Sequence, residues 1–454
     1  MFGKLRKRLK EHRVFVVFLL VTMMLMAAGI IWVYHVKVLN APKIYSDGFG
    51  YFVYLPAILY RDFQFDFVRN FEHPLTLERV YGGLINRYSM GVAIMESPFF
   101  FAAHVLSLLR DAWTGSFTAT GYSNLYQYFV LFGGVVYYGI GTILLYGLLI
   151  RYLNISKRIA SITCILITYG TNLFHYASYD AGYSHVYSYM LLTLFLYYLC
   201  WYEERDEANK NNIMHTCIVG VLAGMIFMVR NVNIIFVVTY ILYGVIDWNS
   251  LKKRLFIVLK PKRVLPIILA GVVTILPQLF YWYAETGHWI LYSYGSSNPS
   301  FYWLHPELIN FLFSVRKGLF FWNPILIVPI IGIVYAYKNR NKLYTGLVLF
   351  LIMIIYLSSA WWGWYGGGSY GQRVAVDFMC IFAVFLAVLL NGLHMRQMET
   401  VGTNKVLRLI QIVVYGYCCI CVIWDCICTL AYWYRIIPTD EATWQHIAAI
   451  IEWL

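Results

Sequence analysis

Residues 14–34 read VFVVFLLVTMMLMAAGIIWVY, a run without a single charged side chain. About 20 apolar residues in a helix are enough to cross the hydrocarbon core of a bilayer. Similar runs recur at residues 126–150, 264–282, 346–360 and 406–432. Lipid offers the backbone no hydrogen-bond partner, so such runs form helices or closed barrels, and barrel strands would alternate polar and apolar residues. The sequence therefore predicts an all-α polytopic membrane protein.

The overall composition points the same way. The chain is 61% hydrophobic and 13% charged, whereas about a quarter of the residues in a soluble domain are charged. The net charge is +13, and the positive residues gather in short segments, above all at residues 4–13 and 252–263. Because lysine and arginine are enriched in cytoplasmic loops of membrane proteins, we interpret these segments as cytoplasmic loops. We expect no binding of nucleic acid.

The same charges predict the orientation. If the apolar run at residues 90–109 crossed the membrane, the basic loop at residues 151–158 would lie outside, against the charge rule. We therefore expect residues 37–122 to form one long outer loop, in which residues 90–109 are a helix lying in or re-entering the interface. Counting the other runs gives about eleven transmembrane helices, with the N-terminus inside and the C-terminus outside.

We expect a single transmembrane domain over residues 1–454, without a separate soluble domain. Its further outer loops fall at residues 177–185, 285–317 and 361–373. Acids, histidines, glycines, tryptophans and tyrosines gather in the predicted outer loops, while the inner loops carry lysine and arginine. An ionisable residue at membrane depth is energetically expensive and marks a candidate functional site. The polar chemistry is therefore expected on the outer side.

Asp47 is the first candidate. It lies soon after the first span, in the stretch YSDGFGYFVYLPA at residues 45–57, between tyrosines and glycines. A carboxylate held near an interface can act as a general base if its environment keeps a suitable pKa. The alternative is that Asp47 only caps a helix beginning at Gly48.

Two further candidates follow at helix ends. Asp180, Tyr183 and His185 lie in a short outer loop, where polar groups on a tight turn can bind a phosphate or a sugar; a hydrogen-bonded turn between helices is the alternative. Arg230 lies at the outer end of a predicted span. An arginine there can meet a phosphate bidentately or simply extend its head group to water.

The fourth candidate is the glycine-rich stretch at residues 361–373, WWGWYGGGSYGQR. An interfacial belt would explain its tryptophans. It would not explain three consecutive glycines followed by Gln372 and Arg373, because glycines allow the backbone to approach a ligand closely. Asp377 follows one turn later. Lys317, just before another predicted span, is a further candidate contact for an anion.

Taken in order, these segments resemble the GT-C superfamily of membrane glycosyltransferases, and its bacterial mannosyl-, arabinosyl- and lipopolysaccharide-modifying branch most. The resemblance covers roughly residues 14–390. The stretches that carry it are YSDGFGYFVYLPA (45–57), RYSMGVAIMESPFF (87–100), YDAGYSHVYSY (179–189), GMIFMVRNVN (224–233), RKGLFFWNP (316–324) and WYGGGSYGQR (364–373).

The resemblance implies an enzyme of the outer face of a membrane, expected to be the bacterial inner membrane. It implies a polyprenyl-phosphate sugar as donor, a lipid, glycan or protein as acceptor, and transfer with inversion. Asp47 would be the catalytic base. The residues expected to contact phosphate or substrate are Asp180, Tyr183, His185, Arg230, Lys317, Gln372 and Arg373.

Family members often carry paired acids in the first outer loop, whereas Asp47 is followed by glycine and the next carboxylates are Asp62 and Asp66. The sequence therefore assigns no cofactor, and it leaves a divalent metal ion open. Two other functions would fit the same kind of membrane protein. A transporter or flippase of lipid-linked sugars is less favoured because we find no internal repeat. An O-antigen polymerase or ligase would lack this first-loop pattern.

Overall fold

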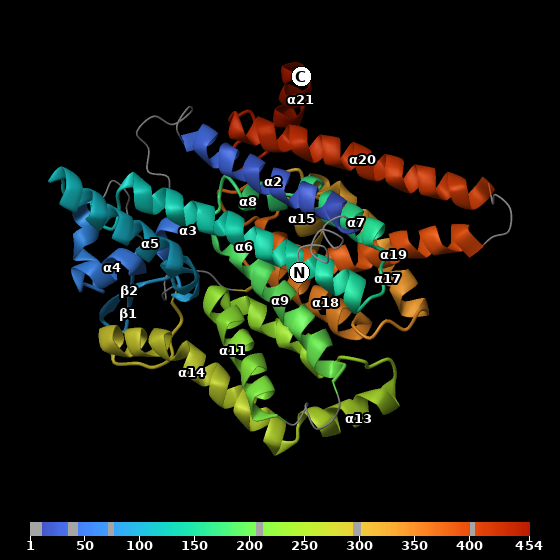
Figure 1. Ribbon diagram of the computed structural model, residues 1–454, viewed down its shortest axis with the longest axis horizontal. Helices are drawn as coiled ribbons and strands as arrows, with labels where there is room; N and C mark the ends of the chain where they lie inside the picture. The colour runs from blue at the N-terminus through green and yellow to red at the C-terminus, as the bar shows by residue number, and fades with distance from the viewer. Residues whose placement is uncertain (1–10, 35–43, 71–76, 206–211, 294–300, 400–404) are drawn as a thin grey trace.

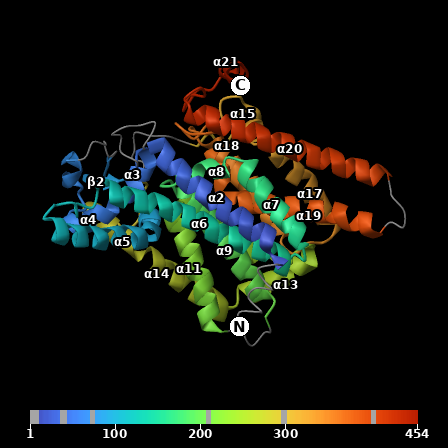
Figure 2. The ribbon, with the colours of Figure 1, turned by 45° about the horizontal axis from the view of Figure 1, so that its top comes forward.

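A computed structural model of the chain describes residues 11–34, 44–70, 77–205, 212–293, 301–399 and 405–454. Three long helices, α2 (Arg13–Trp32), α6 (Asn124–Arg151) and α20 (Lys405–Trp433), run along the length of the molecule (Figure 1). In the view turned by 45°, the same three helices still run along the length of the molecule (Figure 2). The molecule is thus a bundle of long apolar helices, as the sequence predicts.

By length and composition, six helices of the described residues can cross a membrane: α2, α5 (Gly91–Thr114), α6, α14 (Pro261–Thr286), α20 and the segment Arg373–Gln397. That segment contains η5 (Arg373–Phe378) and most of α19 (Met379–Glu399). The shorter or less apolar helices are α7 (Lys157–Tyr169), α9 (Ser184–Glu203), α11 (Ile213–Val229), α13 (Trp248–Val258), α17 (Ile327–Lys338), α18 (Tyr344–Ala360) and α21 (Trp444–Trp453). The all-α membrane class is confirmed, while the count of eleven spans and their orientation stay predictions.

Short elements connect these helices. They are α3 (Ser46–Phe52), α4 (Tyr54–Tyr60), η2 (Asp66–Asn70), α8 (Leu173–Tyr176), η3 (Asn231–Val237), α12 (Val238–Ile241), α15 (Leu308–Phe313), α16 (Leu319–Trp322) and η4 (Pro324–Leu326). The only sheet of the described residues is an antiparallel hairpin of β1 (Leu77–Val80) and β2 (Gly83–Asn86). This hairpin is a small departure from the all-α prediction.

Helices α6 and α9 run in the same direction. Gly134 of α6 faces Ala181, just before α9. Further along α6, Gly147 faces Tyr197 in the later part of α9. Two parallel helices need a connection that runs back, and α7 supplies it. Its Thr168, near its end, bonds Tyr138 of α6 across 2.7 Å. The three helices therefore alternate in direction, and their orientation relative to a membrane stays a prediction.

Helix α5, expected to lie in or re-enter the interface, packs antiparallel to the first half of α6. Tyr137 of α6 donates to the carbonyl of Met95 near the start of α5, at 2.7 Å, and His104 lies 2.5 Å from the hydroxyl of Tyr126 near the start of α6. Helix α5 therefore begins beside the middle of α6 and follows only part of its length. With α3, α4 and the hairpin it gathers at one end of the bundle (Figure 1).

Three further apolar runs, which the count of about eleven spans includes, do not form continuous helices. The run at residues 319–337 breaks at Asn323 because Pro324 lacks an N–H and forces the preceding residue out of the helical region. The run at residues 232–245 is η3 followed by the single turn α12. The run at residues 159–176 ends its main helix at Tyr169 and resumes as α8. These breaks bring loop backbone into the bundle, where it builds the site described next.

Candidate functional site

Asp47 lies in the first turn of α3. Its Oδ1 accepts a hydrogen bond from the hydroxyl of Tyr88 at 2.8 Å, and its Oδ2 lies 2.8 Å from Nη1 of Arg373. The helix begins at Ser46, and no side chain caps it. The alternative in which Asp47 is only a helix cap is therefore wrong, because its carboxylate binds two groups that are remote in sequence.

The two glycines beside Asp47 allow α3 to pack closely. A Cβ atom at Gly48 would lie 3.3 Å from the backbone oxygen of Gly182, and a Cβ atom at Gly50 would overlap the ring of Tyr88. A larger residue at either position would push α3 away from its neighbours. The Asp-Gly-Phe-Gly sequence therefore places the carboxylate against both the Tyr88 hydroxyl and the loop before α9.

Tyr88 is itself held in place by the end of the hairpin. Its backbone N–H donates to Oδ1 of Asn86 at 3.1 Å, and its carbonyl accepts from the hydroxyl of Tyr54 at 2.6 Å. Asn86 also donates through Nδ2 to the carbonyl of Gly50 at 2.7 Å. Nothing in the local sequence signals this role of Tyr88, which becomes evident only once the hairpin is folded against α3.

Arg373 is the first residue of η5 and reaches Asp47 from the glycine-rich stretch. Gly366 has a φ of 74°, in the left-handed region that favours glycine, and a Cβ there would lie 3.3 Å from Cγ of Arg373. The guanidinium carbon also lies 5.9 Å from the ring centre of Tyr183, within range of a cation–π contact. Gly366, one of the glycines predicted to let the backbone approach a ligand, makes room here for the stem of Arg373.

The electrostatic setting keeps Asp47 charged. Burial raises the pKa of Asp47, but the Arg373 charge and the Tyr88 hydrogen bond outweigh it and hold the pKa below its ordinary value. The side chain nevertheless keeps 23% of its surface exposed, so a ligand can reach it. The position therefore offers an ionised and accessible carboxylate beside a cation.

Asp377, one turn after Arg373 on η5, organises a second polar group. Its Oδ1 lies 2.8 Å from Nδ1 of His185, while its Oδ2 accepts from Nδ2 of Asn233 at 2.8 Å and lies 3.0 Å from Nε of Arg230. The carboxylate is fully buried, whereas the Arg230 side chain keeps 21% of its surface exposed. Arg230 is thus fixed by a buried acid, and the only sequence signal for this acid is its position shortly after Arg373.

Three other predicted contacts have partners inside the protein. Asp180 accepts from the hydroxyl of Tyr45 at 2.8 Å and lies 3.0 Å from Nε2 of the buried His175. Nζ of Lys317 donates to the backbone carbonyl of Ser369 and to that of Thr439.

Burial lowers the pKa of Lys317 to about 7. Gln372 is fully buried and donates through Nε2 to the carbonyl of Trp364 at 3.0 Å. Asp180, Lys317 and Gln372 thus brace the loops around Asp47, and their direct contact with substrate stays a prediction.

The paired residues form one continuous region. Arg373 and Asp377 share η5, and Tyr183 and His185 flank the start of α9, so the Asp47 group and the Arg230 group are joined by two short segments. His185 also lies close enough to contribute to the lowered pKa of Asp47. We call Asp47, Tyr88, His185, Arg230, Arg373 and Asp377 the Asp47 cluster.

An apolar pocket of about 610 Å³ lies beside this cluster, between α4, α5 and α14. Tyr54 lines it and also bonds the backbone of Tyr88. Ile94 and Phe101 of α5 and Phe280 of α14 line the pocket and are exposed at the surface of the bundle. The pocket thus extends from the surface of the bundle to Tyr54, whose hydroxyl binds the backbone of Tyr88 in the Asp47 cluster.

Among the described residues, no group of three or more His, Cys, Asp or Glu side chains is arranged to hold a metal ion. Asp47 has a cation and a hydroxyl donor on its two oxygens. Asp62 accepts backbone N–H groups of Gln64 and Phe67 within its own loop. These arrangements do not fit metal ligation, so we derive no step through a metal.

A search of solved structures finds a match over 92% of this chain, with a TM-score of 0.52 and 12% sequence identity. The match is a crystal structure of the Archaeoglobus fulgidus oligosaccharyltransferase tethered with an acceptor peptide that contains the NVT sequon. The chain has a GT-C fold. At this level of identity the match shows the GT-C fold alone, and the bacterial branch of the superfamily stays a prediction.

A second structure of the same archaeal protein, AglB, in complex with an inhibitory peptide and a dolichol-phosphate, matches 92% of this chain with a TM-score of 0.47 and 13% identity. This chain covers 55% and 56% of the longer chains in these two structures. No family model matches the sequence. No curated protein matches it either.

Proposed function

We propose that this protein is a glycosyltransferase that moves a sugar from a polyprenyl-phosphate donor to an acceptor hydroxyl, with inversion and with Asp47 as general base. One observation carries the proposal. An accessible carboxylate lies between the Tyr88 hydroxyl and the Arg373 guanidinium, and a second cation, Arg230, is fixed close by. A base for the acceptor and cations for the leaving phosphate are what such a transfer needs. The GT-C fold is consistent with it.

In the proposed reaction Asp47 takes the proton of the acceptor hydroxyl. The hydroxyl oxygen attacks the anomeric carbon from the face opposite the phosphate, and the bond between that carbon and the phosphate oxygen breaks. The phosphate leaves with the electron pair, and Arg373 and Arg230 stabilise its charge. Arginine suits this role because its planar fork binds phosphate through two parallel hydrogen bonds.

The ion pair with Arg373 has a consequence for the order of events. While Arg373 binds Asp47, the low pKa makes the carboxylate a weak base. A donor phosphate that draws Arg373 away removes the charge that lowers this pKa, and burial then raises it. Donor binding would therefore activate the base, and the resting pair would hold Asp47 inactive in the absence of donor.

The apolar pocket between α4, α5 and α14 suits the isoprenoid chain of the donor. It opens at the bundle surface and ends at Tyr54, which holds the backbone of Tyr88. An Ile94→Trp substitution would narrow the pocket and should raise the KM for long-chain donors but not for a short-chain analogue. Leu106→Trp, on an exposed part of the same α5 helix, is the matched control and should change neither KM. An equal effect of both substitutions would rule out this pocket.

We place the reaction on the outer face of the membrane, expected to be the bacterial inner membrane. Arg151 binds Tyr197 and Arg254 binds Glu203, both in the later part of α9, whereas His185 of the Asp47 cluster lies at the start of that helix, which supports this orientation. The acceptor would be a lipid, glycan or protein that presents a hydroxyl. The acceptor peptide belongs to the archaeal structure and does not identify the acceptor here.

The direct test uses the purified full chain in proteoliposomes. Polyprenyl-phosphate pentoses and hexoses are offered one at a time with a cell-envelope fraction as acceptor, and products are read by mass spectrometry. We expect one donor to yield an acceptor heavier by one sugar residue, together with free polyprenyl phosphate. Movement of the intact donor across the bilayer without any transfer would overturn the proposal in favour of a flippase.

A further inference from the structure

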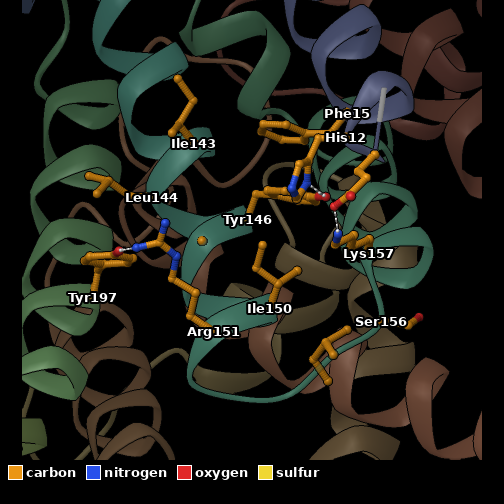
Figure 3. Close-up of a pocket in the computed structure, with 13 residues that line it drawn as sticks. His12, Phe15, Ile143, Leu144, Tyr146, Ile150, Arg151, Ser156, Lys157 and Tyr197 are labelled. Carbon is orange, nitrogen blue, oxygen red and sulfur yellow. Dashed lines mark hydrogen bonds and ion pairs between the residues drawn. The ribbon is translucent and has the colours of Figure 1, made fainter. Parts of the chain in front are cut away.

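A second cavity, of about 730 Å³, lies near the opposite end of the bundle from the Asp47 cluster. The start of α2, the end of α6, the start of α7 and the later part of α9 line it (Figure 3). Asp47 packs near the beginning of α9, while Tyr197 of this cavity lies about 18 Å further along that helix at 1.5 Å per residue. The cavity is therefore separate from the candidate active site.

The polar groups of this cavity are mostly cationic. Nζ of Lys157 bonds Oε2 of Glu11 at 2.8 Å, so these two charges compensate each other. Nη1 of Arg151 donates to the neutral hydroxyl of Tyr197 at 3.0 Å, and no carboxylate of the described residues pairs with Arg151. His12 lies on the opposite wall, 2.8 Å from the hydroxyl of Tyr146 (Figure 3). The cavity thus carries one net positive charge from an exposed arginine, beside a titratable histidine.

The rest of the wall is apolar and faces outward. Ile143, Leu144 and Ile150 of α6 line the cavity together with Arg151 and His12 (Figure 3). Ile143 is 52% exposed, and Ile140 and Val136, one and two turns earlier on the same face of α6, are 40% and 37% exposed. An apolar track therefore leads from the cavity along α6 toward the middle of the bilayer.

We propose that this cavity binds the phosphate headgroup of an anionic membrane phospholipid. Arg151 contacts the phosphate, and one acyl chain follows Ile143, Ile140 and Val136. A basic pocket between helices on the cytoplasmic side is a recognised setting for anionic lipid headgroups. The continuous track selects a lipid over a free phosphate ion, because an ion would leave the apolar wall unused.

The test compares ligands on the purified full chain in detergent. We expect phosphatidylglycerol to raise the unfolding temperature and to remain bound in native mass spectrometry, while phosphatidylcholine and inorganic phosphate do neither. Arg151→Gln should weaken phosphatidylglycerol binding about tenfold, because one charge-assisted contact is lost. Arg158→Gln removes another exposed charge, at the start of α7 and outside the cavity, so this variant should bind as the wild type does.

A second variant keeps the test decisive if Arg151→Gln folds poorly. Ile143→Trp changes only an exposed wall residue and should obstruct the track, so it should reduce phosphatidylglycerol binding, while inorganic phosphate still has no effect. Three outcomes would overturn the proposal: equal stabilisation by phosphatidylcholine, stabilisation by inorganic phosphate alone, or equal losses in Arg151→Gln and Arg158→Gln. None of these measurements depends on transferase activity, so they stand apart from the proposed function.

Discussion

Replacing Asp377 by asparagine should destabilise the protein more than an ordinary polar substitution. The carboxylate is fully buried and holds three donors: Arg230 at 3.0 Å, and His185 and Asn233 at 2.8 Å. An asparagine keeps one oxygen but turns an NH₂ group toward donors. It also leaves the guanidinium of Arg230 without its carboxylate.

The cost follows from burial. Breaking a fully buried ion pair by removing one partner costs about 3–5 kcal/mol, because the remaining charge is left uncompensated. Arg230 keeps 21% of its side chain exposed, so water can partly solvate it. We therefore expect a loss near the lower limit, about 3 kcal/mol in the free energy of unfolding.

The measurement is equilibrium unfolding in mixed micelles with increasing SDS, for Asp377→Asn, Arg230→Met and the double variant. Because the double variant has no unpaired charge, its loss should be about 2 kcal/mol smaller than the sum of the single losses. The control is Asp247→Asn, in an exposed capping box of α13, where asparagine caps as well as aspartate. A loss below about 1 kcal/mol for Asp377→Asn, or strict additivity of the pair, would refute the assigned role of Asp377.

Three further predictions test separate parts of the structure. Gly91→Ala should cost about 1–3 kcal/mol in unfolding free energy because a Cβ would overlap the backbone of Met228, whereas Gly416→Ala, with open space around it, should not destabilise. Arg373→Gln removes the charge that lowers the pKa of the catalytic carboxylate, so the acid limb of its residual activity should move to higher pH. The buried Lys317 has a pKa of about 7 when folded and binds its proton more strongly when unfolded, so wild-type stability should rise with pH above 7, and Lys317→Met should abolish that rise.

The sequence locates the long helices well because their signal is local. The run at residues 14–34 became α2 at Arg13–Trp32, and the run at residues 126–150 became α6 at Asn124–Arg151. Apolar composition and length decide these elements without reference to the rest of the chain. The break at Asn323 also has a local signal, Pro324, but a criterion of continuous apolar runs ignores a single proline.

The site was only partly predictable. Asp47 and Arg373 are each singled out by their surroundings, but their pairing joins the first loop to η5 and depends on how the bundle packs. Tyr88 was missed because its role depends on the hairpin and on the space left by Gly50. Lys317, predicted to contact an anion, binds backbone carbonyls that two distant segments bring together, and the sequence does not signal these bonds.

The central claim is that Asp47 is the base of a sugar transfer, and donor turnover by Asp47→Asn tests it most directly. The matched control is Asp62→Asn, which changes an acid that binds only its own loop. We expect Asp47→Asn to lose transfer by a factor of about 10²–10⁴ while it binds the polyprenyl-phosphate sugar as well as the wild type. Asp62→Asn should transfer normally. Full turnover by correctly inserted Asp47→Asn would contradict the account.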